Sequence, residues 1–218
     1  MFGVRRRLLA ALCGFLWLSS ASAASPDASA AAATAVRGDA GRVARWVIER
    51  ADHRGRPFAV VDKRGARIHV FEPSGVLVGA TAVLLGLAAG DRDAVQNIGE
   101  RSVTSLLPQE RTTPAGRFDT VPGHNDKGEA VVWFQYDAAL AIHRLRPAPA
   151  HERRPQRLAS PDPAERRITF GCVVVPVTFY EDVIASTLGS RRGVVYVLPE
   201  EGSVEALLRD ADLALHAP

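Results

Sequence analysis

Cysteine is scarce in this sequence. Only two of the 218 residues are cysteine, Cys13 and Cys172. Cys13 lies in an apolar run near the N-terminus and follows Leu12, where a lipoprotein signal requires a small residue. The sequence therefore predicts no lipid anchor.

Long apolar segments are also lacking. The run 8–18 is too short to span a bilayer, and it follows three arginines at 5–7. Small residues come next, and Ala21 and Ala23 match an A-x-A cleavage signal. We interpret residues 1–23 as a signal peptide, so that the mature protein is exported to the periplasm with no integral membrane segment after cleavage.

Cleavage leaves Cys172 as the single cysteine. In an oxidising compartment a lone cysteine cannot form an internal disulfide. It is a buried bystander, an intermolecular link or a working thiol. The absence of a C-x-x-C pair argues against a thiol-exchange protein.

Excess charge of one sign is absent from the mature chain. The formal net charge of +3 belongs to the signal peptide, whose removal leaves 24 basic and 24 acidic residues. Such a chain has no net field that attracts phosphates, so we expect no nucleic-acid partner. The sequence also has no pattern with metal-ligand spacing and no glycine-rich phosphate loop, so we expect no metal and no cofactor.

The remaining length suits one domain with flanking segments. Residues 24–38 form an Ala/Ser-rich linker, and Asp39 is a candidate N-cap for a helix with Val43, Trp46 and Val47 on one face. Residues 39–200 then form the domain, including this helix. Residues 201–218 form a C-terminal helix that begins at Ser203.

Short strands dominate the domain. Runs rich in β-branched and aromatic residues occur at 58–62, 67–71, 76–83, 116–121, 130–136, 139–145, 168–175 and 193–198. Turn residues at 63–66 and 72–75 predict that the first three form an antiparallel meander. A capping-box pattern at Thr178 predicts a helix that closes at Gly189. The expected fold class is mainly β with peripheral helices.

Residues 146–167 differ from their surroundings. They contain five prolines and six arginines and show no clear periodicity. Loops of this length inside a compact domain are uncommon and are often functional. The segment is either a lid over a site or a disordered surface insertion, and the sequence leaves both interpretations open.

Cys172 follows Gly171, which permits a tight turn that presents a thiol with backbone N–H groups near it. A small apolar side chain in a β core explains the local sequence equally well. His143 is the best candidate partner, because it ends the apolar run 139–142 and an imidazole activates a thiol. A half-buried histidine with a satisfied hydrogen bond is the commoner alternative.

The sequence resembles the L,D-transpeptidase catalytic domain, the YkuD-type family, over residues 57–198. The matching parts are His143, the later run Thr169-Phe170-Gly171-Cys172-Val173-Val174, and Thr113-Pro114-Ala115-Gly116-Arg117-Phe118. The hairpin at 60–71 resembles the family's first hairpin. The resemblance implies an L,D-transpeptidase-like β-sandwich.

This resemblance also implies an activity. The cysteine would attack an L,D peptide bond of a peptidoglycan stem peptide, His143 would transfer the proton, and backbone N–H groups near Gly171 would bind the oxyanion, with Thr169 positioning the loop. The acyl group would pass to a second stem peptide, a lipoprotein amine or water. Such an enzyme serves peptidoglycan biosynthesis, cell-wall organisation and cell shape.

Two positions bear on substrate binding. Arg117 is a candidate for a substrate carboxylate, with a solvated arginine as the alternative. Val174 stands where the family has Arg or Asn, and valine offers no hydrogen bond. The alternative function is therefore a catalytically weak or inactive peptidoglycan-binding module of the same fold.

Overall fold

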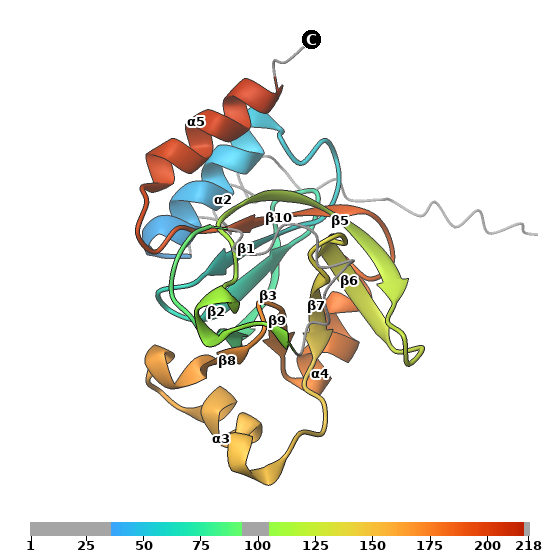
Figure 1. The fold of residues 1–218 in the computed structure, drawn as a ribbon. Coiled ribbons are helices and arrows are strands. Elements are labelled where there is room, and N and C mark those ends of the chain that lie inside the picture. The colour runs from blue at the N-terminus through green and yellow to red at the C-terminus, as the bar shows by residue number, and fades with distance from the viewer. Residues whose placement is uncertain (1–35, 93–104, 216–218) are drawn as a thin grey trace, which may run out of the picture.

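The computed structural model describes residues 36–92 and 105–215. The predicted signal peptide and most of the predicted linker therefore lie outside the described residues. The structure is dominated by one eight-stranded sheet with helices around it (Figure 1). The predicted mainly β fold with peripheral helices is confirmed.

The order of the strands in the large sheet is β3-β2-β1-β10-β5-β6-β7-β9. Their bounds are β1 Phe58–Asp62, β2 Arg67–Phe71, β3 Leu77–Ala82, β5 Gly116–His124, β6 Ala130–Gln135, β7 Leu140–Arg144, β9 Val173–Val175 and β10 Gly193–Val197. The strand β10 joins the halves of the sheet, because it pairs in parallel with β1 and antiparallel with β5. A second sheet pairs β4, Leu85–Gly86, with β8, Arg167–Thr169.

The first three strands form the predicted antiparallel meander. The turn between β1 and β2 is held by the Asp62 side chain, which accepts a hydrogen bond from the Gly65 N–H at 3.0 Å. The bounds of β1 and β2 match the prediction, since each strand is a short run rich in β-branched and aromatic residues that ends in turn residues.

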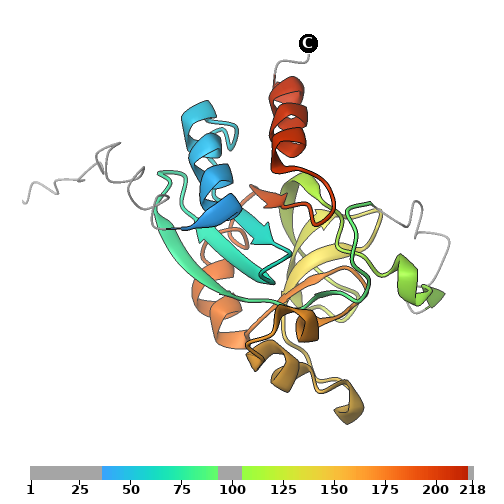
Figure 2. The same ribbon diagram turned by 90° about the vertical axis from the view of Figure 1, so that its left-hand side faces the viewer.

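The main core lies between the two halves of the curved sheet. Residues of β1, β2 and β10 contribute to it from one half, and Val132, Ile142 and Val173 contribute from the other. A second core lies on the opposite face of β1 and β10, where the helices α2, Gly38–Arg50, and α5, Val204–Leu215, cover them. Figure 2 shows these two helices rising from the same side of the sheet. Both helices present an apolar stripe that the sheet buries.

The predicted strand 168–175 is wrong as a single element. The chain forms β8, turns at Phe170-Gly171-Cys172 and continues as β9, so the two short strands belong to different sheets. Gly171 has a φ of 130°. That backbone conformation is open to glycine and strained for other residues, and it breaks the strand.

The helix termini also differ in part from the predictions. Asp39 lies in the first turn of α2 rather than at its N-cap, which is Arg37. Its carboxylate still favours the helix N-terminus. The helix expected at Thr178 begins one residue earlier as α4, Val177–Phe179, and continues as a π-helical turn at Tyr180–Ile184, with no side-chain cap. The predicted start of α5 is confirmed, since Ser203 Oγ accepts a hydrogen bond from the Ala206 N–H.

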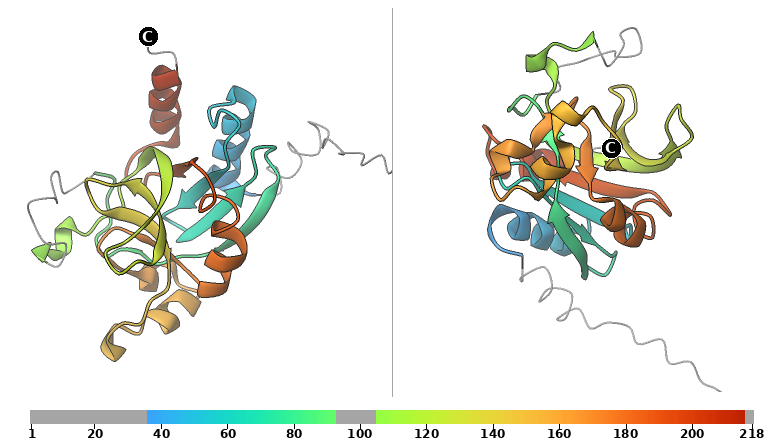
Figure 3. Two further views of the ribbon diagram at one scale, coloured as in Figure 1. Left: turned by 90° about the vertical axis from the view of Figure 1, so that its right-hand side faces the viewer. Right: turned by 90° about the horizontal axis from the view of Figure 1, so that it is seen from below.

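Segment 146–167 is folded, so the disordered alternative is wrong. It contains the helix α3, Arg154–Ala159, and 3₁₀ turns at Ala150–Glu152 and Pro163–Arg166. Figure 1 places it at the end of the molecule opposite α2 and α5, and Figure 3 shows it from below. Buried Arg166 anchors it by donating hydrogen bonds to the carbonyls of Ser160 and Ala66.

Within residues 36–92 and 105–215 there is no helix with the length and apolar content needed to cross a membrane.

Candidate active site

Cys172 lies at the end of the turn between β8 and β9. Its thiol Sγ is 3.6 Å from the carbonyl oxygen of Ala139. The turn requires a glycine before the cysteine, because a Cβ on Gly171 would lie 2.5 Å from the carbonyl oxygen of Thr112 and 2.7 Å from Leu140 Cδ2. The close packing of this turn fixes the position from which the thiol projects.

Two threonines hold the turn. Thr169 Oγ1 donates to the carbonyl of Cys172 at 2.8 Å and accepts from the Gly171 N–H at 3.1 Å. Thr113 Oγ1 donates to the carbonyl of Gly171 at 2.9 Å and accepts from the Gly86 N–H at 2.9 Å. Both threonines are buried, so no water competes for these bonds. Thr169 is thus hydrogen-bonded to the turn on both sides of Gly171.

The thiol and His143 lie on one face of the sheet. Strand β7 pairs in parallel with β9, so that Ile142 is opposite Val173 and His143 is opposite Val174. Cys172 immediately precedes β9, and the same register puts it beside Ala141. Because residues two apart in a strand share a face, Ala141, His143 and Cys172 project from the same face. Ile142 and Val173 project from the other face into the main core.

His143 is held as a neutral base. It is buried, and its Nδ1 lies 2.8 Å from the carbonyl oxygen of Arg144. A carbonyl oxygen only accepts hydrogen bonds, so in the neutral ring the proton is on Nδ1 and the lone pair is on Nε2. Burial, together with the charge of Arg146, lowers the pKa of His143 to about 4. The ring is therefore uncharged at neutral pH and has an unprotonated Nε2.

The thiol of Cys172 is protonated in this environment. The residue as a whole is half-buried, and burial of the sulfur raises the pKa of the Cys172 thiol. A backbone hydrogen bond at Ala141 and the charges of Arg146 and Arg154 oppose this effect. Both the thiol and the imidazole of His143 are thus neutral in the resting state, and neither shift favours a thiolate–imidazolium pair.

Two arginines from segment 146–167 act electrostatically on both side chains. Arg146 and Arg154 both influence the pKa of His143 and that of Cys172. Each also has a carboxylate partner: Arg146 Nε is 2.8 Å from Glu129, and Arg154 pairs with Glu152. The folded segment therefore supplies positive charge to the neighbourhood of the thiol.

Val174 is fully buried in a small cluster with Leu84 and Leu158. Its backbone N–H and carbonyl both bond to Leu84 at 2.9 Å. Leu158 belongs to α3, so the valine fastens segment 146–167 to the sheet. The Val174 side chain is packed against protein and is not exposed to a ligand.

Arg117 is not brought to the Cys172 turn. It lies on β5, and its Nε donates to the buried carboxylate of Asp52 at 2.7 Å. The same carboxylate accepts the hydroxyl of Tyr196. Burial opposes the charge of Arg117, but the bond to Asp52 outweighs it and raises the pKa of Arg117. The arginine ties β5 to the end of α2.

Sequence reasoning missed two residues that support the turn. Thr113 begins the signature at 113–118, yet only Arg117 of that signature was a candidate. The second is Lys63, whose fully buried Nζ donates to the carbonyl of Thr113 at 2.9 Å and to Asp91 at 2.9 Å. The sequence did contain a signal for Lys63. The chain has only two lysines, Lys63 and Lys127, and Lys63 directly follows an apolar strand.

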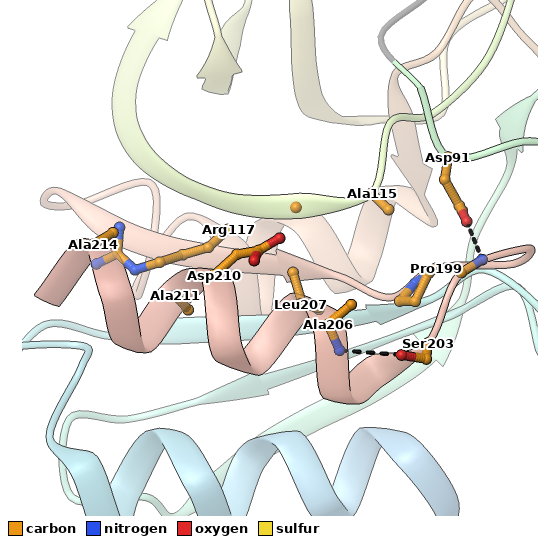
Figure 4. A pocket seen from close by; sticks show the side chains of 12 residues that line it. Asp91, Ala115, Arg117, Pro199, Ser203, Ala206, Leu207, Asp210, Ala211 and Ala214 are labelled. Atoms are coloured by element: carbon orange, nitrogen blue, oxygen red, sulfur yellow. Dashed lines mark hydrogen bonds between the residues drawn. The ribbon is translucent and has the colours of Figure 1, made fainter.

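Several hollows among the described residues lie away from Cys172 and His143. A cavity of about 420 Å³ separates α5 from β5, with Asp91 at one end and Arg117 at the other (Figure 4). Its floor is formed mainly by alanines of α5. In this cavity both terminal charges are already paired, Asp91 with Lys63 and Arg117 with Asp52. In the described residues, no group of three or more His, Cys, Asp or Glu side chains is arranged to hold a metal ion.

Comparisons with known proteins give one distant structural neighbour. No family model matches the chain, and no curated protein matches it. Among solved structures, the chain is similar to the NMR structure of the catalytic domain from E. faecium L,D-transpeptidase. The two are 16% identical with a TM-score of 0.38, and the match covers 66% of this chain and 98% of the other.

Proposed function

We propose that this protein is an exported, periplasmic cysteine acyltransferase that forms an acyl-enzyme with peptidoglycan stem peptides, as an L,D-transpeptidase does. One observation carries the proposal: Cys172 projects from a closely packed turn on the same sheet face as His143, whose neutral imidazole has an unprotonated Nε2. The motif resemblance at 113–118 and 169–174 supplies the substrate class.

The proposed reaction starts from the neutral pair. His143 Nε2 takes the proton from the Cys172 thiol as the sulfur attacks the carbonyl carbon of the peptide bond. The tetrahedral intermediate collapses, the C–N bond breaks, and His143 returns the proton to the leaving amine. A thioester remains on Cys172 until a second amine or water attacks it and regenerates the thiol.

Coupling of proton transfer to attack follows from the two pKa shifts. The pKa of Cys172 is raised and that of His143 is lowered to about 4. Both shifts oppose a standing ion pair, because each disfavours the charged form of its group. In the proposed mechanism His143 therefore acts as a general base during the attack, and the positive charge it gains is transient.

The negative charge that develops on the substrate carbonyl oxygen during the attack needs hydrogen-bond donors. The Gly171 N–H is engaged by Thr169 Oγ1, so the proposed donors are the other backbone N–H groups of the turn at 170–172. The Thr169 and Thr113 bonds fix the turn that carries them. Fixed backbone donors are the most effective stabilisers of such an oxyanion. Arg146 and Arg154 add positive charge beside the same site.

The test is acylation by a carbapenem. The strained β-lactam ring is an acyl donor that an activated thiol opens, so one carbapenem should add covalently to each molecule and remain on Cys172. Intact-mass measurement over time gives the stoichiometry and the rate, and peptide mapping gives the position. His143→Gln should slow the labelling by at least about a hundredfold, the ordinary contribution of a general base.

Two controls make this result decisive. Cys172→Ser should carry no adduct, and His53→Gln should label at the wild-type rate, because His53 binds the carbonyls of Val47 and Pro73 away from the site. An unlabelled wild-type protein with an intact circular dichroism spectrum would contradict the proposal. Incubation with tetrapeptide muropeptides then identifies the acceptor from the masses of the products.

A second candidate function is a peptidoglycan-binding module with little or no turnover. The raised pKa of Cys172 and the apolar Val174 favour it. It predicts that Cys172→Ala still binds muropeptides and that the wild-type protein generates neither cross-linked nor trimmed products. Transpeptidation or hydrolysis by the wild-type protein would exclude it.

A further inference from the structure

An exposed pair of aromatic side chains lies at the end of β6. Tyr136 has 74% of its surface exposed. Its ring centroid is 5.2 Å from that of Trp133, and the ring planes are inclined at 73°. The two rings therefore form an open corner, and no part of the described chain covers the tyrosine. Exposed large aromatic surfaces of this kind mark binding sites.

The corner opens on a hollow of about 540 Å³. Besides the two rings it is lined by Val121, Pro122, Gly123, His124, Phe134 and Asp119. Asp119 is paired with Arg56 at 2.9 Å and Arg117 at 3.2 Å. The hollow thus combines aromatic and apolar faces with the His124 side chain and the backbone of β5, and its single carboxylate is already ion-paired. A neutral ligand rich in hydroxyl groups fits this chemistry better than a strongly charged one.

The tryptophan is held in place by a glycine. A Cβ on Gly123 would lie 2.9 Å from both Cδ1 and Nε1 of Trp133. The indole consequently lies directly on the backbone of β5, where a larger residue at position 123 would displace it. A ring fixed in this way loses little entropy when a ligand packs on it.

The register of the strands connects this corner with the candidate active site. Trp133 is opposite Val121 on β5 and opposite Ala141 on β7. Ala141 is in turn beside Cys172 in the register of β7 and β9. Residues opposite one another across strands share a face. Trp133, Ala141 and Cys172 therefore form a row across one face of the sheet.

We propose that the corner formed by Trp133 and Tyr136 binds a sugar ring of the peptidoglycan glycan strand. The C–H groups on one side of a pyranose ring carry partial positive charge and pack on the negative faces of aromatic rings. The hydroxyl and N-acetyl groups at its rim meet His124 and the backbone of β5. The choice of an N-acetylhexosamine rests on the proposed function, because the stem peptide that reaches Cys172 is attached to such a sugar.

The experiment is a titration of the Cys172→Ala protein with chitotetraose, the tetramer of N-acetylglucosamine, followed by NMR of the indole N–H signals. Trp133→Phe assigns the Trp133 signal. This signal should shift and saturate, while that of Trp46, which lies on α2 and packs against the second core, should not move. Cellotetraose, which lacks the N-acetyl groups, should bind at least about tenfold more weakly.

Variants of exposed residues test the site without threatening the fold. Tyr136→Ala should weaken chitotetraose binding about tenfold, since a stacked ring contributes on the order of 1.4 kcal/mol. Tyr136→Phe should retain it. Leu213→Ala removes another exposed apolar side chain, on α5, and should leave binding unchanged.

The outcomes separate this inference from the proposed function. Absence of a saturable shift, equal binding of cellotetraose, or unchanged binding by Tyr136→Ala would each overturn the glycan site. Carbapenem labelling of the wild-type protein is measured in parallel. A protein that binds chitotetraose and is not acylated contradicts the acyltransferase alone, and one that is acylated and does not bind chitotetraose contradicts the glycan site alone.

Discussion

At the scale of single residues, His143 shows how burial determines chemistry. The ring is enclosed by protein, its Nδ1 bonds to the Arg144 carbonyl, and Arg146 lies near enough to oppose a second positive charge. Burial and the charge of Arg146 lower its pKa from 6.5 to about 4, against the bond to the Arg144 carbonyl, which raises it. The fold therefore prefers the neutral ring over the charged one by about 3 kcal/mol.

This preference predicts how stability depends on pH. The unfolded chain binds a proton at His143 below about pH 6.5, whereas the folded protein binds it only below about pH 4. The contribution of the neutral ring is complete above pH 6.5 and is lost as the pH falls to 4. The free energy of unfolding should therefore fall between pH 7.5 and pH 4, and this fall should be about 3 kcal/mol larger in the wild-type protein than in His143→Gln. Chemical denaturation of both proteins at the two pH values measures it. Equal falls in the two proteins would show that the ring is not buried as a neutral group.

At the scale of elements, the Cys172 turn depends on a loop distant in sequence. Thr113 precedes β5, yet its hydroxyl bridges the Gly86 N–H on β4 and the Gly171 carbonyl. Lys63, at the end of β1, holds the Thr113 carbonyl from the other side. Four segments of the chain thus converge on the backbone of the turn, and buried side chains add to the pairing of β4 with β8 in joining them.

Removing one hydroxyl tests this bracing. Thr113→Val keeps the shape of the side chain and leaves the Gly86 N–H and the Gly171 carbonyl without this partner in a buried place. We expect a loss of about 2 kcal/mol in the free energy of unfolding and slower carbapenem labelling of Cys172, since each unsatisfied buried group costs about 1–3 kcal/mol. Thr113→Ser should preserve both quantities. Wild-type labelling by Thr113→Val would show that the turn is held without this bond.

The elements differ in how far the sequence predicts them. The strands β1 and β2 were predictable to the residue, because each is a short run of β-branched and aromatic residues bounded by tight turns. The division of 168–175 into β8 and β9 was not, since it depends on Thr112 and Leu140 packing against Gly171. Cys172 and His143 were candidates from their residue types and motif, whereas Thr113 and Lys63 support the turn through contacts between segments that only the folded chain reveals.

At the scale of the whole molecule, β10 unites two half-sheets that local sequence specifies separately. The meander of β1, β2 and β3 lies on one side of it, and β5, β6, β7 and β9 lie on the other. The buried carboxylate of Asp52 reinforces this junction, because it binds Tyr196 on β10 and Arg117 on β5. Burial and the bond to Asp52 raise the pKa of Tyr196, so its hydroxyl remains a donor.

The last prediction distinguishes a structural from a substrate-binding Arg117. Arg117→Leu leaves the carboxylate of Asp52, which is 1% exposed, without its cation, and such a loss costs about 3–5 kcal/mol of unfolding free energy. Carbapenem labelling of the protein that remains folded should be unchanged, because the arginine does not reach the Cys172 turn. Arg56→Leu is the matched control: its partner Asp119 is 58% exposed, and the change should cost less than about 1 kcal/mol. A stable Arg117→Leu protein with greatly slowed labelling would instead assign the guanidinium to the substrate.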